Sequence, residues 1–194
     1  MKRDSHRRPF GPRPSVPDPR RHLLGAVLAF VRAARSRPGI LRIALVGSLT
    51  TDKPIPKDAD VLVTIDASMV LSSLARIGRR LKGAGNSINL SADIFLADAA
   101  GRYIGRICRY RECHARALCR AQHCSRRQHL NDDLHVVTLD ATLVAAPPIE
   151  LWPRIVRRVA VPVDTEALLV AELDQDERQR GDAGSTDPTL IESN

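Results

Sequence analysis

The amino-acid sequence predicts a mixed domain of the α/β or α+β class. Helical and strand-like patterns follow one another in the order helix, strand, loop, strand, helix, strand over residues 22–97. A hydrophobic content of 43% is enough for a packed core, and an aromatic content of 3% means that aliphatic side chains must fill it. At 194 residues the chain has room for one domain with an arm, an insertion or a tail.

The first half of this pattern is a helix followed by two strands. Apolar residues recur at helical spacing from residue 22 to about residue 37, where Pro38-Gly39 ends the predicted helix. Residues 41–46 form a short apolar run, which predicts a buried strand ending at Gly47. A loop with two prolines leads to a second predicted strand over residues 59–65.

The second half begins with a helix over residues 69–81, which we expect to end at Gly83 and Gly85, and continues with a third strand over residues 89–97. Further strands are predicted over residues 103–110 and 135–139, and a strand and turn over residues 151–163. Residues 164–180 have a helical composition. We divide the chain into a disordered basic arm (1–21), a main domain (22–150) with an Arg- and Cys-rich insertion (102–129), a C-terminal extension (151–180) and a disordered tail (181–194).

Charge is unevenly distributed along the chain, whose net charge is +8. Residues 1–22 carry seven Lys or Arg, and residues 102–129 carry eight Arg against Glu112 alone. Residues 164–194 reverse the sign, with nine acidic residues. The basic segments favour an anionic partner such as a nucleotide or nucleic acid, and the alternative is an Arg-rich codon bias. No apolar run approaches the roughly 18 residues that span a membrane, so we expect a soluble, cytoplasmic protein.

Three aspartates and a Gly-Ser pair are the candidate functional residues. Gly47 would let a phosphate approach the backbone closely, and the Ser48 hydroxyl could donate to a phosphate oxygen. Asp58 and Asp60 open the second strand and point to one face of it, while Asp93 comes from the third strand. Carboxylates about 7 Å apart repel each other unless a cation lies between them. The pattern therefore predicts a site for Mg²⁺ or Mn²⁺, and the alternative is loop capping and a water-facing edge residue.

In this order of elements the sequence resembles the nucleotidyltransferase superfamily with a β-polymerase-like core, and in particular its small, minimal members. The family's pattern is an apolar strand with Gly-Ser or Gly-Gly, then Asp-x-Asp or Asp-x-Glu, then a third acidic residue on a later strand. Residues 43–48, 58–63 and 92–94 match these three parts, and the resemblance covers residues 22–98.

The resemblance implies a mixed sheet with flanking helices and a metal-dependent transfer of a nucleoside monophosphate from a nucleoside triphosphate to a hydroxyl of a nucleic-acid or protein acceptor. Asp58 and Asp60 would hold the metals, and Asp93 would complete one site and help to deprotonate the hydroxyl. Small members often carry an Arg after the Gly-Ser turn and a Ser before the Asp pair, and this chain has neither. Lys53 or Lys57 could supply the missing charge.

The alternative hypothesis for the function of this chain involves no catalysis. Minimal family members sometimes act with a helical partner, as in toxin–antitoxin modules, so the chain could be an inactive, zinc-stabilised module that binds nucleic acid or protein. A module of that kind needs none of the three aspartates.

The four cysteines lie close together in the chain, at Cys108, Cys113, Cys119 and Cys124. In a cytosolic protein such a cluster favours a structural zinc site, with unmetallated thiols as the alternative. His114 or His123 could replace one cysteine as a ligand. A second polar group, His129, Asp132, Asp133 and His135, is expected mainly to cap a loop, with metal binding as the alternative.

Overall fold

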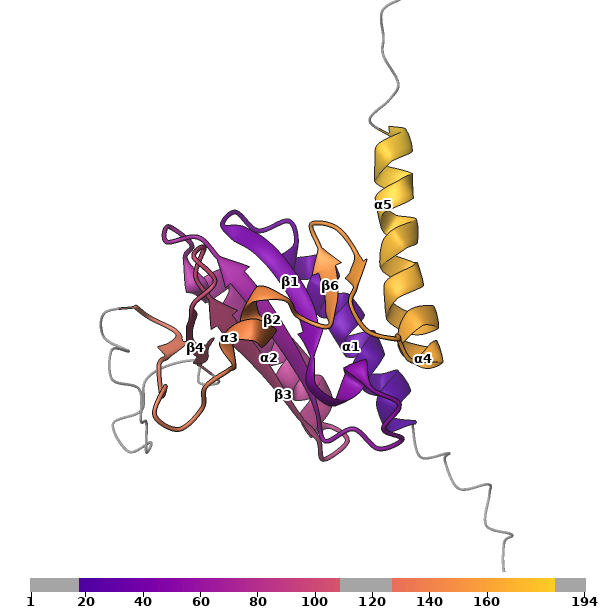
Figure 1. The fold of residues 1–194 in the computed structure, drawn as a ribbon, viewed down its shortest axis with the longest axis horizontal. Coiled ribbons are helices and arrows are strands. Elements are labelled where there is room, and N and C mark those ends of the chain that lie inside the picture. Colours follow the sequence, from indigo (N-terminus) through magenta and orange to yellow (C-terminus); the bar gives the residue numbers. More distant parts are fainter. Residues whose placement is uncertain (1–17, 109–126, 184–194) are drawn as a thin grey trace, which may run out of the picture.

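A computed structural model describes residues 18–108 and 127–183 of the chain (Figure 1). A seven-stranded mixed sheet with the strand order β5-β4-β3-β2-β1-β6-β7 forms its centre. No helix in these two ranges is both long and apolar enough to cross a membrane. The elements are α1 (Pro19–Ala34), β1 (Ile40–Val46), a 3₁₀ turn (Gly47–Thr50), β2 (Asp58–Ile65), α2 (Leu71–Asn86), β3 (Ser91–Ala97), β4 (Tyr103–Ile107), β5 (Leu130–Asn131), α3 (Ala141–Ala145), β6 (Ile149–Trp152), β7 (Val156–Arg157), α4 (Val163–Thr165), a π-helical turn (Glu166–Val170) and α5 (Ala171–Ala183).

The strand pairing follows from the connections. β1 is antiparallel to both β2 and β6, and β3 is antiparallel to β4. β2 and β3 are parallel, so the chain needs a crossover between them, and α2 provides it. The sheet is therefore mixed, with flanking helices, as the sequence predicts.

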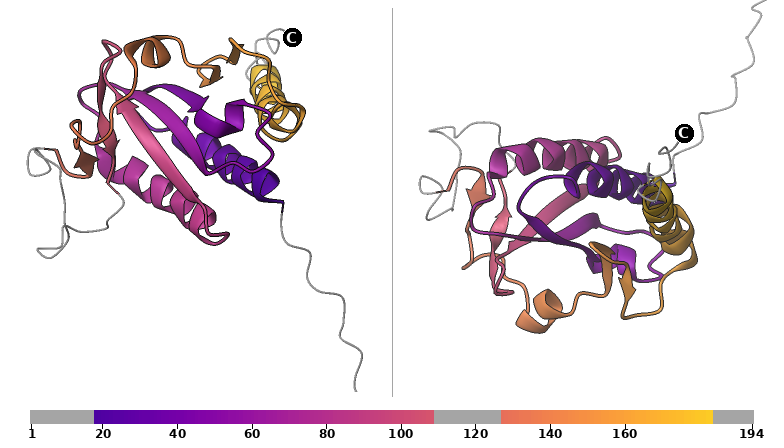
Figure 2. Two further views of the ribbon diagram at one scale, coloured as in Figure 1. Left: turned by 60° about the horizontal axis from the view of Figure 1, so that its bottom comes forward. Right: turned by 90° about the horizontal axis from the view of Figure 1, so that it is seen from above.

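Helices α1 and α2 lie side by side on one face of the sheet, and α3 lies on the opposite face (Figure 2). The larger core lies under α1 and α2 and contains fully buried side chains such as Leu23, Leu45 and Leu74. A smaller core on the other face joins Leu62 and the strand residues beside it to Val144 of α3. Tyr103, Val137 and Leu139 also pack against this smaller core.

Two predicted elements differ from the observed ones. Helix α2 passes through Gly83 and Gly85 and runs on to Asn86. A Cβ at Gly85 would lie 2.9 Å from the Ser91 carbonyl oxygen, so this glycine permits close packing against the start of β3 and does not end the helix. The strand predicted over residues 135–139 is wrong: residues 134–136 form a turn, and the short strand β5 lies earlier, at residues 130–131.

The ends of the described segments differ by a few residues from the predicted boundaries. Helix α1 starts at Pro19, inside the segment expected to be an arm, because the Asp18 side chain accepts a hydrogen bond from the Arg20 N–H and caps it. Strand β6 crosses residue 150 and pairs with β1, so the C-terminal extension shares the central sheet. Helix α5 reaches Ala183, and its Leu173 is fully buried in the larger core.

Candidate functional site

The three aspartates lie on one face of two neighbouring strands. Asp60 of β2 and Asp93 of β3 are direct partners in the parallel pairing, which places their backbones about 4.8 Å apart. Asp58 lies two residues earlier on β2 and therefore points to the same face. The residues between them, such as Ala59 and Ala92, are buried under the helices. All three carboxylates consequently point away from α1 and α2.

Gly47 brings the turn after β1 against this group. It has a positive φ of 72°, and Val46 pairs with Asp60 in the β1–β2 ladder. A Cβ at Gly47 would lie 2.4 Å from Oδ2 of Asp60, so no larger residue fits while that carboxylate keeps its place. Ser48 is half-buried next to it, and its hydroxyl donates to the Asp58 carbonyl oxygen at 3.3 Å. The predicted Gly-Ser pair and the aspartates thus form one continuous site.

The carboxylates repel one another. Burial raises the pKa of Asp60, and the negative charges of Asp58 and Asp93 and a hydrogen bond with the Asp58 side chain raise it further, to about 7. The charge of Lys82 acts in the opposite direction and is the smallest of these effects. Asp60 therefore holds its proton to a higher pH than an ordinary aspartate does.

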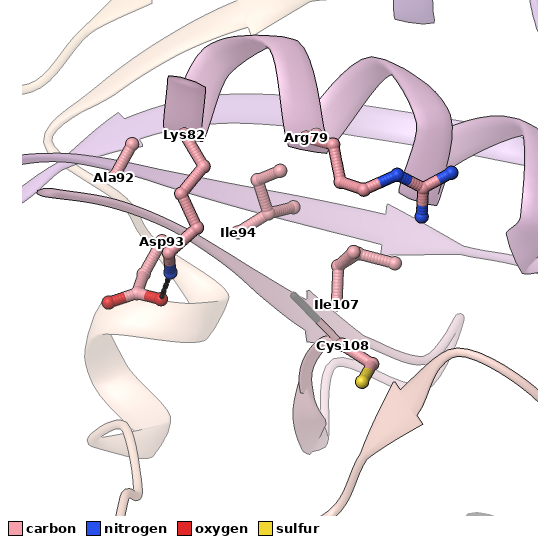
Figure 3. A pocket seen from close by; sticks show the side chains of 8 residues that line it. Arg79, Lys82, Ala92, Asp93, Ile94, Ile107 and Cys108 are labelled. Atoms are coloured by element: carbon pink, nitrogen blue, oxygen red, sulfur yellow. Dashed lines mark hydrogen bonds and ion pairs between the residues drawn. The ribbon is translucent and has the colours of Figure 1, made fainter. Parts of the chain in front are cut away.

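Asp93 is in contact with two cationic side chains. Nζ of Lys82, from α2, donates to Oδ1 of Asp93 at 3.0 Å (Figure 3). An Arg106 guanidinium nitrogen, from β4, lies 3.7 Å from the same oxygen. Lys82 and Asp93 are both partly exposed, at 24% and 26% of their side-chain surface. Oδ1 of Asp93 is thus in contact with two cationic side chains of the protein.

Arg106 also extends the polar site toward β5. Its guanidinium donates to Oδ2 of Asp133 at 2.7 Å, and the Asp133 side chain is only 7% exposed. Asp133 is therefore an ion-pair partner and not a simple loop cap. Tyr103 packs on Phe95 with ring centroids 6.3 Å apart. Burial is the main cause that raises the pKa of the Tyr103 phenol to about 12.

A buried arginine fixes the loop that follows the Gly-Ser turn. Arg20 of α1, 6% exposed, donates to the carbonyl oxygens of Thr51 and Lys53 at 2.9 Å each. The same guanidinium forms an ion pair with Asp164 and donates to the hydroxyl of Thr165 at 3.1 Å. The Thr165 hydroxyl in turn donates to the Leu49 carbonyl at 2.9 Å. This Arg20 clamp ties residues 49–53 to both α1 and α4.

The other predicted site residues are less informative. Lys53 and Lys57 are exposed, and no hydrogen bond or ion pair joins either ammonium group to another residue of the described chain. Cys108 is a free, buried cysteine, while Cys113, Cys119 and Cys124, with His114 and His123, lie outside the described residues.

No group of three or more His, Cys, Asp or Glu side chains within residues 18–108 and 127–183 is arranged to hold a metal ion. The second polar group, around His129 and Asp133, therefore provides no metal site, and neither does the part of the Cys-rich insertion that the structure describes. The zinc site stays a prediction. For the aspartates, the ion pair of Asp93 with Lys82 shows that this carboxylate is already engaged by a cation.

Sequence reasoning missed Lys82, Arg106 and Arg20. A signal existed for Lys82, because the last turns of a crossover helix lie beside the first residues of the strand that follows it. Lys82 and Asp93 are only 11 residues apart along the chain. Nothing in the local sequence indicated the role of Arg20, because its ion-pair partner Asp164 lies 144 residues away.

Comparison with known proteins identifies no family for this chain. No protein-family model, no curated protein and no solved structure matches the chain. The function must therefore be argued from the geometry of the site.

Proposed function

We propose that the chain is a metal-dependent nucleotidyltransferase that moves a nucleoside monophosphate from a nucleoside triphosphate to a hydroxyl acceptor. The observation that carries the proposal is the direct pairing of Asp60 with Asp93 on adjacent parallel strands, with Asp58 on the same face. A purely structural role gives no reason to gather three carboxylates on one face, where burial first, and then the charges of Asp58 and Asp93, raise the pKa of Asp60 to about 7.

The residues of the site match a divalent cation in the chemical type of their side chains. Carboxylate oxygens are the ligands that Mg²⁺ and Mn²⁺ prefer, and Asp58, Asp60 and Asp93 would supply them. The absence of a side chain at Gly47 lets Oδ2 of Asp60 approach the backbone of the turn, since a Cβ there would lie only 2.4 Å from it. A bound divalent ion would supply positive charge to the phosphate oxygens and to the attacking oxygen.

The chain's own groups would bind and orient the nucleotide. The turn at Gly47 is exposed and lets a phosphate approach the backbone, and the Ser48 hydroxyl, which holds the Asp58 carbonyl only at 3.3 Å, can turn to a phosphate oxygen. In the transfer the acceptor oxygen forms a bond to the α-phosphorus, the bond to pyrophosphate breaks, and the hydroxyl proton passes to Asp93. The Arg20 clamp keeps the loop after the turn in one position while this happens.

Two observations favour the non-catalytic alternative, a nucleotidyltransferase-like binding module. Asp93 is already paired with Lys82, and the three aspartates are not arranged as a ready metal site. An inactive module would keep this ion pair permanently, whereas an enzyme must open it. The two functions therefore differ in whether the carboxylates bind a divalent ion at all.

A transfer assay tests the proposal. The full chain is incubated with Mg²⁺ and each α-labelled nucleoside triphosphate, with candidate acceptors that include RNA, protein and the chain itself. We expect label on an acceptor and release of pyrophosphate, both lost in Asp58→Asn/Asp60→Asn. Asp52→Asn is the matched control, because Asp52 is an exposed aspartate of the adjoining loop. Release of pyrophosphate that persists in the double variant would contradict the proposal.

A further inference from the structure

Helix α2 has a strongly basic outer side. It carries Arg76, Arg79, Arg80 and Lys82 and has no aspartate or glutamate anywhere along its length. Arg76 and Arg80 are exposed and one helical turn apart, and Arg79 lies three residues after Arg76, on the flank that also carries Lys82 (Figure 3). Arg76, Arg79 and Arg80 therefore form one group of neighbouring cations, which we call the arginine cluster.

The described chain does not neutralise the arginine cluster. No hydrogen bond or ion pair joins any of its three side chains to another residue within 18–108 and 127–183, and Nη1 of Arg79 is buried without an acceptor. By contrast, Lys82 is paired with Asp93, and Arg32 of α1 is paired with two carboxylates of α5. Like charges three or four residues apart destabilise a helix. Helix stability therefore does not account for the cluster.

The segment next to the arginine cluster adds further positive charge. The Arg127 guanidinium donates to the carbonyl oxygen of Met69, two residues before α2, at 3.1 Å. Burial first, and then the charge of Arg79, lowers the pKa of the His129 imidazole. The positive potential therefore extends from α2 onto residues 127–129.

The arginine cluster and the three aspartates lie on opposite sides of the sheet. Helices α1 and α2 cover one face (Figure 2), and Asp58, Asp60 and Asp93 point away from them. A polyanion would be attracted to the outer side of α2 and repelled by the carboxylates. It would therefore bind at α2 without occupying the carboxylate site.

The surroundings of the arginine cluster favour nucleic acid over a membrane or a protein. Guanidinium groups bind phosphate oxygens in a bidentate manner. The exposed neighbours Ser72 and Gly83 are small, and none of the exposed large apolar side chains of the described chain lies on α1 or α2. Membrane-surface helices and protein interfaces use apolar anchors, whereas interfaces with nucleic acid are polar and positively charged.

We propose that the arginine cluster is a nucleic-acid-binding surface that contacts the phosphate backbone of RNA or DNA. Arg76 and Arg80 donate to phosphate oxygens, and Arg79 adds its uncompensated charge beside them. Because phosphate contacts carry no base information, this binding is independent of sequence. The inference does not rest on the proposed function, since it uses none of the three aspartates and holds equally for a non-catalytic module.

The test is fluorescence anisotropy of a labelled RNA hairpin and, separately, a labelled DNA duplex, each titrated with the full chain at several salt concentrations. Arg76→Gln/Arg80→Gln should weaken binding about tenfold or more at low salt and lower the steepness of log K against log salt by about 2, because each phosphate contact contributes about 0.9. Arg154→Gln/Arg178→Gln removes the same charge from exposed arginines outside α2 and should change the affinity by less than about twofold. The tighter of the two probes distinguishes RNA from DNA.

Three results would overturn the inference. They are a wild-type chain that binds neither probe, an unchanged affinity and salt dependence in Arg76→Gln/Arg80→Gln, and equal losses in the two double variants. Vesicles containing phosphatidylserine are titrated in parallel, and binding to them alone, lost in Arg76→Gln/Arg80→Gln, would assign the surface to lipid instead. If circular dichroism shows that the double variant is not folded, the single variants Arg76→Gln and Arg80→Gln replace it, each with an expected loss of about 1 in steepness.

Discussion

Replacing Arg20 by Met should destabilise the protein and release the loop after the Gly-Ser turn. The substitution removes the donors to the Thr51 and Lys53 carbonyls and the ion pair with Asp164. Breaking a fully buried ion pair costs about 3–5 kcal/mol, but the Asp164 side chain is 37% exposed and can be hydrated once Arg20 is gone. We therefore expect a loss of about 2–3 kcal/mol in the free energy of unfolding, or about 4–12 °C in the thermal midpoint.

Urea denaturation of the full chain measures this loss, and amide hydrogen exchange locates it. Exchange should accelerate most over residues 49–53, where the clamp holds the backbone. Arg21→Met is the matched control, because Arg21 is the neighbouring residue of α1 and is exposed, so its replacement should change stability by less than about 0.5 kcal/mol. Equal stabilities for Arg20→Met and Arg21→Met would refute the assignment of Arg20 as a clamp.

Two further predictions concern the carboxylate group. Gly47→Ala should lower the free energy of unfolding by about 2–4 kcal/mol and abolish nucleotide binding, since φ is 72° and the new Cβ would meet Oδ2 of Asp60 at 2.4 Å. The control Gly101→Ala has a similar φ of 78° but nothing within 4 Å, so it should lower that free energy by only about 1–2 kcal/mol. Equal losses for the two variants in urea denaturation would count against the contact with Asp60. The folded pKa of Asp60, about 7, lies above its unfolded value near 3.9, so the stability linked to its proton is complete below about pH 4 and is lost as the pH rises through 7. Without divalent ions, the stability of Asp60→Asn relative to wild type should therefore rise by about 2–3 kcal/mol from pH 5 to pH 8. Parallel pH profiles of the urea midpoint for the two proteins would show that the pKa is not raised.

The central part of the fold could be predicted because its signals are local. Apolar runs bounded by glycine, proline and charge gave β1, β2 and β3, and the alternation of side chains placed Asp58 and Asp60 on one face. The crossover from β2 through α2 to β3 then explains why Asp93 lies next to Asp60. The three aspartates therefore lie on the same face, as expected from the sequence.

The remaining features depend on contacts that no local pattern encodes. Residues 135–139 look like a strand, yet Val136 is 47% exposed, and the segment instead packs Val137 and Leu139 on the smaller core as a turn and loop. Strands β5 and β7 have two residues each, too few to leave a periodic signal. Arg20 and Asp164 meet only because the C-terminal segment returns to α1.

The most direct test of the central claim is the thermal midpoint of the full chain with each nucleoside triphosphate, with and without Mg²⁺. A ligand that binds only the folded state must raise the midpoint, so the test requires no knowledge of the acceptor. We predict a Mg²⁺-dependent rise in wild type and in Asp52→Asn that is lost in Asp58→Asn/Asp60→Asn. An unchanged midpoint with every nucleotide, in a protein that circular dichroism shows to be folded, would contradict the nucleotidyltransferase proposal and favour the binding module.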